Sequence, residues 1–317
     1  MKFDFEEINL IPKKCIVNSR SECDTSVKLG DFTFKSPVIP ANMECVIDNN
    51  LATKLSNNGY FYIMHRFADT LQFIKNYNDG NLISDGITPI SISIGVNEDS
   101  YQLINKIIEE NLQVHYITID IAHGHSIKME KMIKFVREKL PDVYIIAGNI
   151  SALEAGIDLR NWGANAIKVG VGPGYACSTW PSTGFGSRNC QASTILECSK
   201  IVGVDIIADG GIRVPGDIAK SIVLGAKMVM IGGILSGFKD SPGNIINING
   251  VNKKEFWGSA SKFQSNKSNR IEGIKQLIDF KDRSILEEMA YIQECLQSSI
   301  SYGGGKNLES LKNVKWI

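Results

Sequence analysis

Eight short runs of apolar, often β-branched residues recur along the 317-residue chain. Their starts lie 22 to 39 residues apart, which leaves room each time for a strand, a helix and two loops. The runs are almost continuously apolar, as strands are when a parallel sheet is covered on both faces. They are PVIPAN (37–42), YFYIMH (60–65), PISISIG (89–95), YITIDIA (116–122), YIIAGNI (144–150), AIKVGVG (166–172), DIIADGG (205–211) and MVMIGG (228–233).

The spacers between these runs carry helix patterns. Residues 125–140 end before Pro141, and 214–225 have Asp217 in the first turn and Gly225 at the predicted C-terminal cap. In the first helix the residues expected on the apolar face are Ile127, Met132, Ile133, Val136 and Leu140. Eight alternating strands and helices predict an α/β fold, a (β/α)8 TIM barrel with its strands between about 37 and 233. An open doubly wound sheet is the alternative.

Two regions exceed a minimal barrel, and we expect them to belong to one domain spanning 1–317. Residues 1–36 precede the first strand and contain a possible hairpin at Leu29-Gly30-Asp31. Residues 238–305 are too long for one closing helix: 245–257 predict a hairpin around Asn249-Gly250, and 258–275 are polar, as a lid would be. A capping box of Ser284 and Glu287 starts a last helix whose apolar stripe is Ile285, Met289, Ile292 and Leu296, and we expect glycines 303–305 to end it.

Composition excludes several classes of protein. The chain has 34 basic and 34 acidic residues and no basic block, which argues against binding to nucleic acid or to a membrane surface. It has no apolar run of about 18 residues that could span a bilayer. Its seven cysteines form no C-x-x-C pair, a pattern typical of reduced thiols, so we expect a cytoplasmic protein.

Polar residues and glycines gather where the predicted strands end. In a barrel of this kind the active site lies at the carboxyl ends of the strands. The strand-end residues are Asn42, His65, Arg66, Asp120, His123, His125, Asn149, the loop carrying Cys177, Asp209, Gly210, Gly211, Gly232 and Gly233.

The last two strand ends favour a phosphate site. Glycines at 210–211 and 232–233 would let a phosphate approach backbone N–H groups, and Asp209 could accept hydrogen bonds from ribose hydroxyls. Ordinary tight turns remain the alternative interpretation.

Cys177 lies in GVGPGYACSTW (170–180), and its residue type leaves two roles open. It could be a nucleophile assisted by Thr179, or a small buried residue, which is the role we expect for Cys15, Cys45, Cys198 and Cys295. The His-x-His of 123–125 would need further ligands for a metal, and the chain has four histidines in all. Because no helix pattern follows GVGPGYA, it is not a dinucleotide fingerprint, and a nicotinamide cofactor would have to bind along the open top of the barrel.

Motifs spread over the whole chain resemble the IMP dehydrogenase/GMP reductase family. They are GVGPGYACST…TGFG (170–186), IADGGIR…GDIAKSI…GA (207–226), MIGG (230–233) and SSISYGG (298–304). Four further motifs resemble its bacterial GMP reductase branch: CIVNSRSECDTSV (15–27), PANM (40–43), YFYIMHRF (60–67) and YITIDIAHGHS (116–126). Only about 25 residues separate YFYIMH from PISISIG, where the dehydrogenases usually insert regulatory modules, and 269–281 lack the Arg-Tyr pair of the dehydrogenase flap.

This resemblance implies the conversion of GMP and NADPH to IMP, ammonia and NADP⁺ through a cysteine thioimidate, as a step of purine interconversion and salvage. It implies that Cys177, Thr179 and Glu272 are catalytic. It further implies a homotetramer and a possible monovalent cation, K⁺, on the carbonyls of Gly172, Gly174 and Cys177. The residues implied for the nucleotide are Asp209, Gly210, Gly211, Gly232, Gly233 and Ser259, and those for the cofactor are His65, Arg66, Asp120 and Asn149.

Two alternatives remain beside the reductase: an IMP dehydrogenase without the regulatory module, and a purine-nucleotide-binding regulator without turnover. The second is motivated by the altered loop around Trp180, which is one of three departures from the family pattern. Trp180-Pro181 stands where a basic or polar residue is usual, Arg188-Asn189-Cys190 where glycines or aromatic residues are common, and Lys281-Asp282 where Lys-Gly is common.

Overall fold

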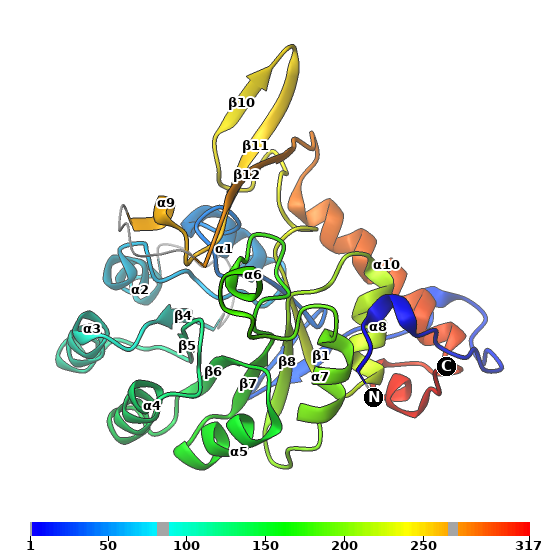
Figure 1. Cartoon of the computed structure of the whole chain (residues 1–317), viewed down its shortest axis with the longest axis horizontal. Coiled ribbons are helices and arrows are strands. Elements are labelled where there is room, and N and C mark those ends of the chain that lie inside the picture. The colour runs from blue at the N-terminus through cyan, green and yellow to red at the C-terminus, as the bar shows by residue number, and fades with distance from the viewer. Residues whose placement is uncertain (1, 81–88, 266–271) are drawn as a thin grey trace.

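The structure is a computed structural model of the 317-residue chain, and it describes residues 2–80, 89–265 and 272–317. In the described part of the chain, seven parallel strands form the central sheet, in the order β3-β9-β8-β7-β6-β5-β4 (Figure 1). Because the first strand of this sheet pairs with the last, the sheet curls as a barrel does. The strands are β3 (Val38–Pro40), β4 (Ser91–Ile94), β5 (Tyr116–Asp120), β6 (Tyr144–Ile150), β7 (Ala166–Val169), β8 (Asp205–Asp209) and β9 (Met228–Ile231).

The predicted strand at 60–65 is the one that the structure does not form as a strand. These residues lie between β3 and β4 in the sequence, and they are buried. Their pairing with the described strands is limited to one parallel bridge, from Met64 to Ile92. Met64 N donates to Ser91 O, and Ser93 N donates to Met64 O. The apolar pattern therefore predicted the burial of this segment correctly, whereas one bridge is too short a ladder for a strand. Residues 60–65 take the place of the eighth barrel strand, next to β4, so the fold is TIM-barrel-like.

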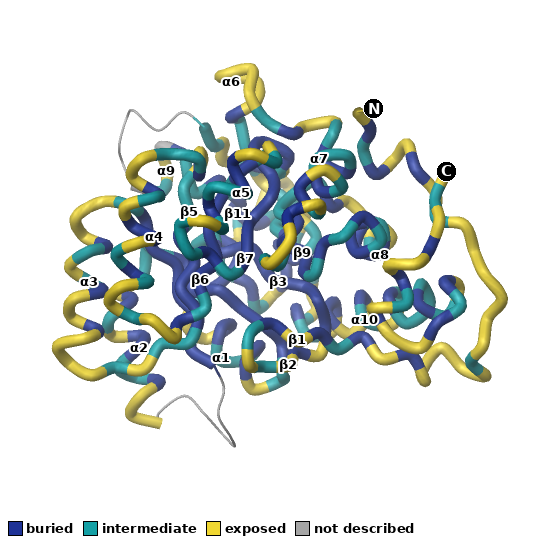
Figure 2. Tube along the Cα trace, turned by 90° about the horizontal axis from the view of Figure 1, so that it is seen from below, coloured by how far each residue is buried: buried dark blue, intermediate teal, exposed yellow. Residues whose placement is uncertain are grey.

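Helices cover the outside of the curled sheet, and the strands lie buried at the centre (Figures 1 and 2). They are α1 (Asn49–Asn57), α2 (Thr70–Asn78), α3 (Glu98–Glu109), α4 (Ile127–Lys139), α5 (Leu153–Trp162), α7 (Gln191–Cys198) and α8 (Pro215–Val223). Side-chain caps start some of them: Asp48 accepts from Leu51 N, and Ser126 accepts from Met129 N. Met132, Ile133 and Val136 of α4 are buried as predicted, but Ile127 is 73% exposed because it stands at the first turn, facing away from the sheet.

The predicted N-terminal hairpin is confirmed. β1 (Val27–Leu29) pairs with β2 (Phe32–Phe34) across a turn in which Gly30 has a φ of 55°. This hairpin packs at the amino ends of the barrel strands, where Tyr116 donates to Leu29 O at 2.6 Å. The short 3-10 helices η1 (Phe5–Glu7) and η2 (Arg20–Glu22) precede it.

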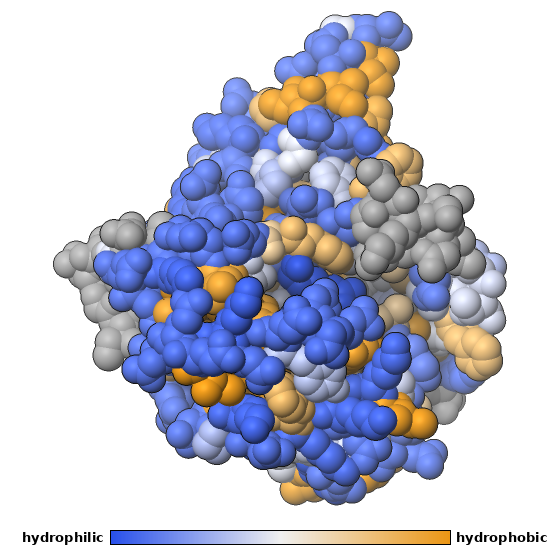
Figure 3. Space-filling model, turned by 90° about the vertical axis from the view of Figure 1, so that its left-hand side faces the viewer, coloured by the Kyte–Doolittle hydropathy of each residue, from blue (hydrophilic) through white to orange (hydrophobic). Residues whose placement is uncertain are grey.

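The region after β9 forms a second sheet and the last helix. β10 (Ile245–Ile248) and β11 (Val251–Trp257) make the hairpin predicted around Asn249-Gly250, and β12 (Lys275–Asp279) adds a third antiparallel strand. This sheet projects from the barrel, and apolar residues gather on the projection in Figure 3. The short α9 (Lys262–Ser265) follows β11, while residues 266–271 of the predicted lid lie outside the described residues.

The last helix, α10 (Ile285–Tyr302), begins with the predicted capping box, in which Glu287 accepts from Ser284 N. Its predicted apolar stripe is buried, and Gly303 ends it. The 3-10 helix η3 (Leu308–Asn313) then closes the chain against α8. Nowhere in the described residues is a helix both long and apolar enough to cross a membrane.

Four cysteines were expected to be buried, and two of them are not. Cys45 and Cys198 are buried, whereas Cys15 is exposed and Cys295 is half-buried. Cys15 lies in residues 11–22, which run over the surface with little of the fold around them, and the local sequence does not distinguish this surface course from a buried one.

Candidate active site

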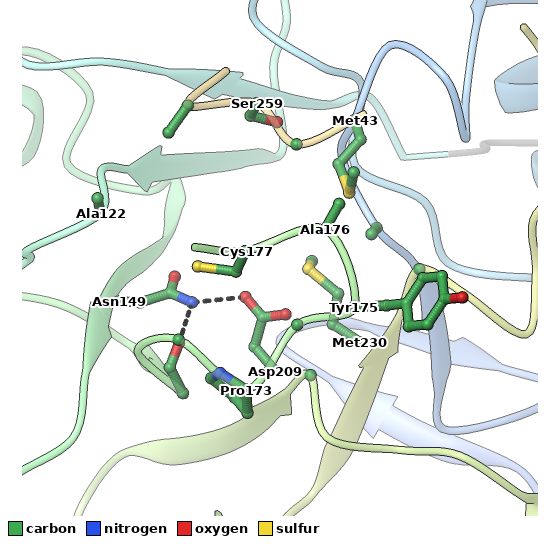
Figure 4. Close-up of a pocket in the computed structure, with 18 of the residues that line it drawn as sticks. Met43, Ala122, Asn149, Pro173, Tyr175, Ala176, Cys177, Asp209, Met230 and Ser259 are labelled. Atoms are coloured by element: carbon green, nitrogen blue, oxygen red, sulfur yellow. Dashed lines mark hydrogen bonds between the residues drawn. The ribbon is translucent and has the colours of Figure 1, made fainter. Parts of the chain in front are cut away.

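A cleft opens at the carboxyl ends of the barrel strands, as the strand-end residues predicted. Figure 4 shows it from within, with Cys177, Asn149 and Asp209 close together on its wall. Residues from nearly every strand end line it: Asn42, Met43, Arg66, Asp120, Asn149, Lys168, Gly172, Gly174, Cys177, Thr179, Asp209, Gly210, Gly211, Gly232, Gly233, Ser259 and Glu272 among them.

The glycine loop after β7 is packed tightly against the end of β8. Gly170 has a φ of 148°, and a Cβ placed there would lie 1.9 Å from Asp209 O, so only glycine fits at this position. The buried Gln191 of α7 fastens the two strand ends, because its Nε2 donates to Val169 O at 2.8 Å and to Asp209 O at 3.2 Å. A loop that looks flexible by composition is thus held in one place.

Cys177, Thr179 and Glu272 form a hydrogen-bonded chain. The Cys177 thiol donates to Thr179 Oγ1 at 3.2 Å, and Thr179 Oγ1 donates to Glu272 Oε2 at 2.7 Å. Thr179 is buried and opens the short helix α6 (Thr179–Thr183). Such a chain can carry a proton between the thiol and the carboxylate through the hydroxyl. The structure therefore brings together the three residues that the resemblance grouped.

Backbone pairing puts Glu272 beside a loop that is distant in sequence. Cys177 forms an antiparallel bridge with Gly273, Ser178 N donates to Glu272 O at 3.0 Å, and Ile274 N donates to Ala176 O at 3.0 Å. A second contact comes from Gly258, whose position is so close to Ala176 that a Cβ there would lie 2.8 Å from Ala176 O. The segment before β12 is consequently fixed against the cysteine loop by its main chain.

A buried lysine, which the sequence patterns did not single out, lies beneath the cleft. Lys168 of β7 is 2% exposed, and its Nζ lies 3.1 Å from Oδ2 of Asp120 and 3.1 Å from Oδ2 of Asp209. Although burial raises the pKa of Asp120, the charge of Lys168 and then that of Arg66 outweigh it and hold this pKa below its ordinary value. Burial lowers the pKa of Lys168, but the two carboxylates outweigh it and raise this pKa overall.

Asn149 joins this group through its amide. Its Nδ2 donates to Asp209 Oδ2 and to Gly170 O, both at 2.7 Å (Figure 4). Its Oδ1 is buried and has no hydrogen-bond partner among the described residues. A buried acceptor of this kind needs a donor, and Asn149 lines the cleft, from which water or a bound molecule can supply one.

Of the remaining strand-end residues, some line the cleft and others point elsewhere. Arg66 lines the cleft, while His65 is buried, accepts from Phe67 N through Nδ1, and is not among the described lining residues. His125 lies outside the cleft, where it contacts Asp158 of α5 at 2.9 Å and stacks on Trp162. In the described ranges, no three His, Cys, Asp or Glu side chains are arranged to hold a metal ion.

Two of the departures from the family pattern contact each other. The Arg188 guanidinium lies over the Trp180 ring at 5.3 Å, and both residues are exposed. In the third departure the residue that differs is Asp282, which is exposed. Lys281 beside it is common to the family pattern, and its Nζ lies over the Phe238 ring at 4.3 Å and donates to Ile234 O.

Comparison with known proteins places the chain among relatives over its full length. The family model described as "IMP dehydrogenase / GMP reductase domain" matches residues 2–317. The chain is 50% identical to the GMP reductase of Bacillus subtilis (strain 168), over 99% of this chain and 95% of that protein. It is 49% identical to the GMP reductases of Clostridium acetobutylicum and Lactobacillus delbrueckii subsp. bulgaricus, over 99% of this chain and 95% and 94% of those proteins.

Proposed function

The chain belongs to the IMP dehydrogenase/GMP reductase family, and we propose that it catalyses the NADPH-dependent reductive deamination of GMP to IMP. The observation that carries this proposal is the hydrogen-bonded chain from Cys177 through Thr179 to Glu272 in the lining of the cleft. The full-length similarity to proteins named GMP reductase supports the choice of substrate.

The three residues suit the removal of an amine from a purine. The thiol proton of Cys177 moves through Thr179 Oγ1 toward Glu272, and the thiolate bonds to carbon 2 of the guanine ring. Breaking the bond from carbon 2 to the amine nitrogen requires a proton on that nitrogen, which the same hydrogen-bonded chain returns as ammonia leaves. A covalent thioimidate of Cys177 remains. When hydride reaches carbon 2, the bond to sulfur breaks and its electron pair returns to the Cys177 thiolate, which frees IMP.

The cleft divides into two sides around this cysteine. We assign the nucleotide to Asp209, Gly210, Gly211, Gly232, Gly233 and Ser259, with the carboxylate accepting from the ribose and the glycine N–H groups facing the phosphate. We assign the cofactor to Asp120, Asn149 and Arg66; His65, which is buried and does not line the described cleft, would support the cofactor through its neighbour Arg66. The unpartnered Oδ1 of Asn149 fits a carboxamide N–H donor such as the nicotinamide carries. NADPH supplies the hydride.

A monovalent cation such as K⁺ is a further part of the proposal. Its ligands would be the main-chain carbonyls of Gly172, Gly174 and Cys177, which lie on one loop. Gly174 O already accepts from Cys177 N at 3.1 Å and has a second lone pair for a cation. Turnover measured in K⁺ and in Na⁺ at equal ionic strength tests this assignment, with equal rates counting against it.

We further propose that the chain acts in purine interconversion and salvage in the cytoplasm, as a homotetramer. The exposed apolar residues of the projecting sheet, Ile245, Ile248, Val251 and Leu277, support contact with a second copy. Light scattering on the purified protein measures the oligomeric state.

The experiment for the activity follows NADPH absorbance and ammonia release together. Purified protein with GMP should consume one NADPH for each ammonia, and Cys177→Ala should abolish both signals. Reduction of NAD⁺ with IMP, without NADPH consumption with GMP, would identify a dehydrogenase instead. GMP binding without any cysteine adduct or turnover would identify a silent nucleotide-binding protein.

A further inference from the structure

The buried ammonium of Lys168 stands between the two sides of the cleft. Asp209 is the residue assigned to the nucleotide, and Asp120 is assigned to the cofactor. Both half-buried carboxylates lie 3.1 Å from the nitrogen of the buried Lys168, so they are also close to each other.

The contacts of the two carboxylates are distributed in the same way. Oδ2 of Asp209 pairs with Lys168 Nζ and accepts a hydrogen bond from Asn149 Nδ2. Oδ2 of Asp120 likewise pairs with Lys168 Nζ and accepts a hydrogen bond from Asn42 Nδ2. No hydrogen bond from a described residue falls on Oδ1 of either carboxylate. One oxygen of each is therefore held by the protein, and the other is left for a ligand hydroxyl.

We infer that Lys168 is a positioning residue that keeps Asp120 and Asp209 both ionised and correctly turned for the sugar hydroxyls of the two bound nucleotides. The inference rests on the proposed function, because it assumes that nucleotides occupy both sides. An ionised carboxylate accepts hydrogen bonds through both oxygens, whereas a protonated one loses an acceptor.

Without the lysine the two carboxylates would repel each other in a poorly solvated place. Like charges that share a buried site raise the pKa of one member, which then carries a proton near neutrality. The groups facing Lys168 are Asp120 from β5 and Asp209 from β8, with Arg66 acting on Asp120 from the segment after 60–65. Asn149 from β6 and Asn42 from the loop after β3 also contact the carboxylates and carry no charge.

The test measures the dissociation constants of GMP and of NADP⁺, each ligand alone, by calorimetry between about pH 5.5 and about pH 8.5. The quantity of interest is the ratio of the variant to the wild-type constant at each pH, because this ratio cancels the ionisation of the GMP phosphate. For Lys168→Met the ratio for one of the two ligands should rise as the pH falls, approaching a tenfold rise per pH unit, since one proton must leave Asp209 before GMP binds or Asp120 before NADP⁺ binds. For Lys168→Arg, which keeps the charge, the ratio should not depend on pH.

A double variant separates charge from folding effects. In Lys168→Met with Asp120→Asn, one carboxylate no longer has a like-charged neighbour, so the rise should move to lower pH. Lys168→Gln is expected to behave as Lys168→Met does and replaces it if the methionine variant does not fold by circular dichroism. A ratio independent of pH for both ligands in the neutral variants, or the same slope in Lys168→Arg, would overturn the inference while leaving the proposed function intact. A wild-type chain that binds no GMP would overturn the proposed function itself, and this inference with it.

Discussion

The placement of Glu272 against the cysteine loop can be tested by adding a single methyl group at Gly273. In Gly273→Ala the new Cβ would lie 2.7 Å from Ser261 N, and the neighbouring atoms, Ala260 C and Ser261 Cα, would be at 3.1 Å. An ordinary contact needs about 3.4 Å, so the two main-chain segments must separate by about 0.7 Å. Neither side can yield by rotating a side chain, because the contacted atoms belong to the backbone.

This separation should act on catalysis more than on binding. Gly273 bridges Cys177, and the residue before it is Glu272, whose Oε2 lies 2.7 Å from Thr179 Oγ1. Misplacing a catalytic group by about 1 Å can cost about 100-fold in rate, so we expect kcat to fall by about 10- to 100-fold. GMP affinity should fall less than kcat, because the glycines and Asp209 lie on other loops and Ser259, next to Ala260, is the one nucleotide residue of the proposal beside the displaced contact.

The matched control is Gly216→Ala. Gly216 lies in the first turn of α8 and has an ordinary φ, and no atom lies within 4 Å of the position that a Cβ would take there, so the added methyl group meets open space. Both variants would be assayed for kcat at saturating GMP and NADPH and for GMP affinity by calorimetry. Equal kcat values for Gly273→Ala and Gly216→Ala would refute the view that this close main-chain contact positions Glu272.

Three other predictions concern single side chains. Glu272→Gln keeps an acceptor for Thr179 but cannot take a proton, so kcat should fall by about 100- to 10,000-fold with GMP affinity retained; an unchanged kcat in the steady-state assay would contradict the relay. Burial lowers the pKa of His65 against the opposing effect of Glu44 and Asp48, so the folded state binds a proton less readily than the unfolded state. Neutral His65 therefore contributes stability that is complete above pH 6.5 and is lost as the pH falls from 6.5 toward the lowered pKa. The urea midpoints of the wild type and of His65→Asn should converge as the pH falls through this range, and a constant difference between the two midpoints would contradict the prediction. Burial raises the pKa of Cys45 and Cys198 to about 12, so iodoacetamide should label exposed Cys15 and leave these two unlabelled in the folded protein, as mass spectrometry would show; labelling of Cys45 at the rate of Cys15 would contradict this.

The convergence of strand ends was predictable because it follows from a general property of parallel sheets. Once 166–172 and 205–211 are recognised as neighbouring buried strands, the loop after one and the carboxylate at the end of the other must lie at the same edge. The structure adds the tight contact of Gly170 with Asp209 O, which fixes how closely they approach. Local motifs were equally informative at the capping box of Ser284 and Glu287, since each depends on only a few consecutive residues.

Lys168 shows what local patterns could not provide. Its place inside the run AIKVGVG was itself a signal, because a lysine in a strand buried on both faces must have charged partners. The identity of those partners depends on two other strands, and the run alone does not name them. His125 is the opposite case: it follows a strand end, yet its loop turns it toward Asp158 and Trp162 of α5 rather than into the cleft.

Trp180 and Arg188 are departures from the family pattern close to Cys177, the nucleophile of the proposed reaction. Their positions limit the effect of these departures. Thr179 is 7% exposed and contacts Cys177 and Glu272, whereas the next residue, Trp180, is 42% exposed and its ring faces the Arg188 guanidinium at 5.3 Å. Position 180 has no basic residue, but the Arg188 guanidinium lies over the Trp180 ring, so the same surface still carries a positive charge. The two departures therefore contact each other outside the hydrogen-bonded chain, and they take no part in the contacts that join Cys177, Thr179 and Glu272.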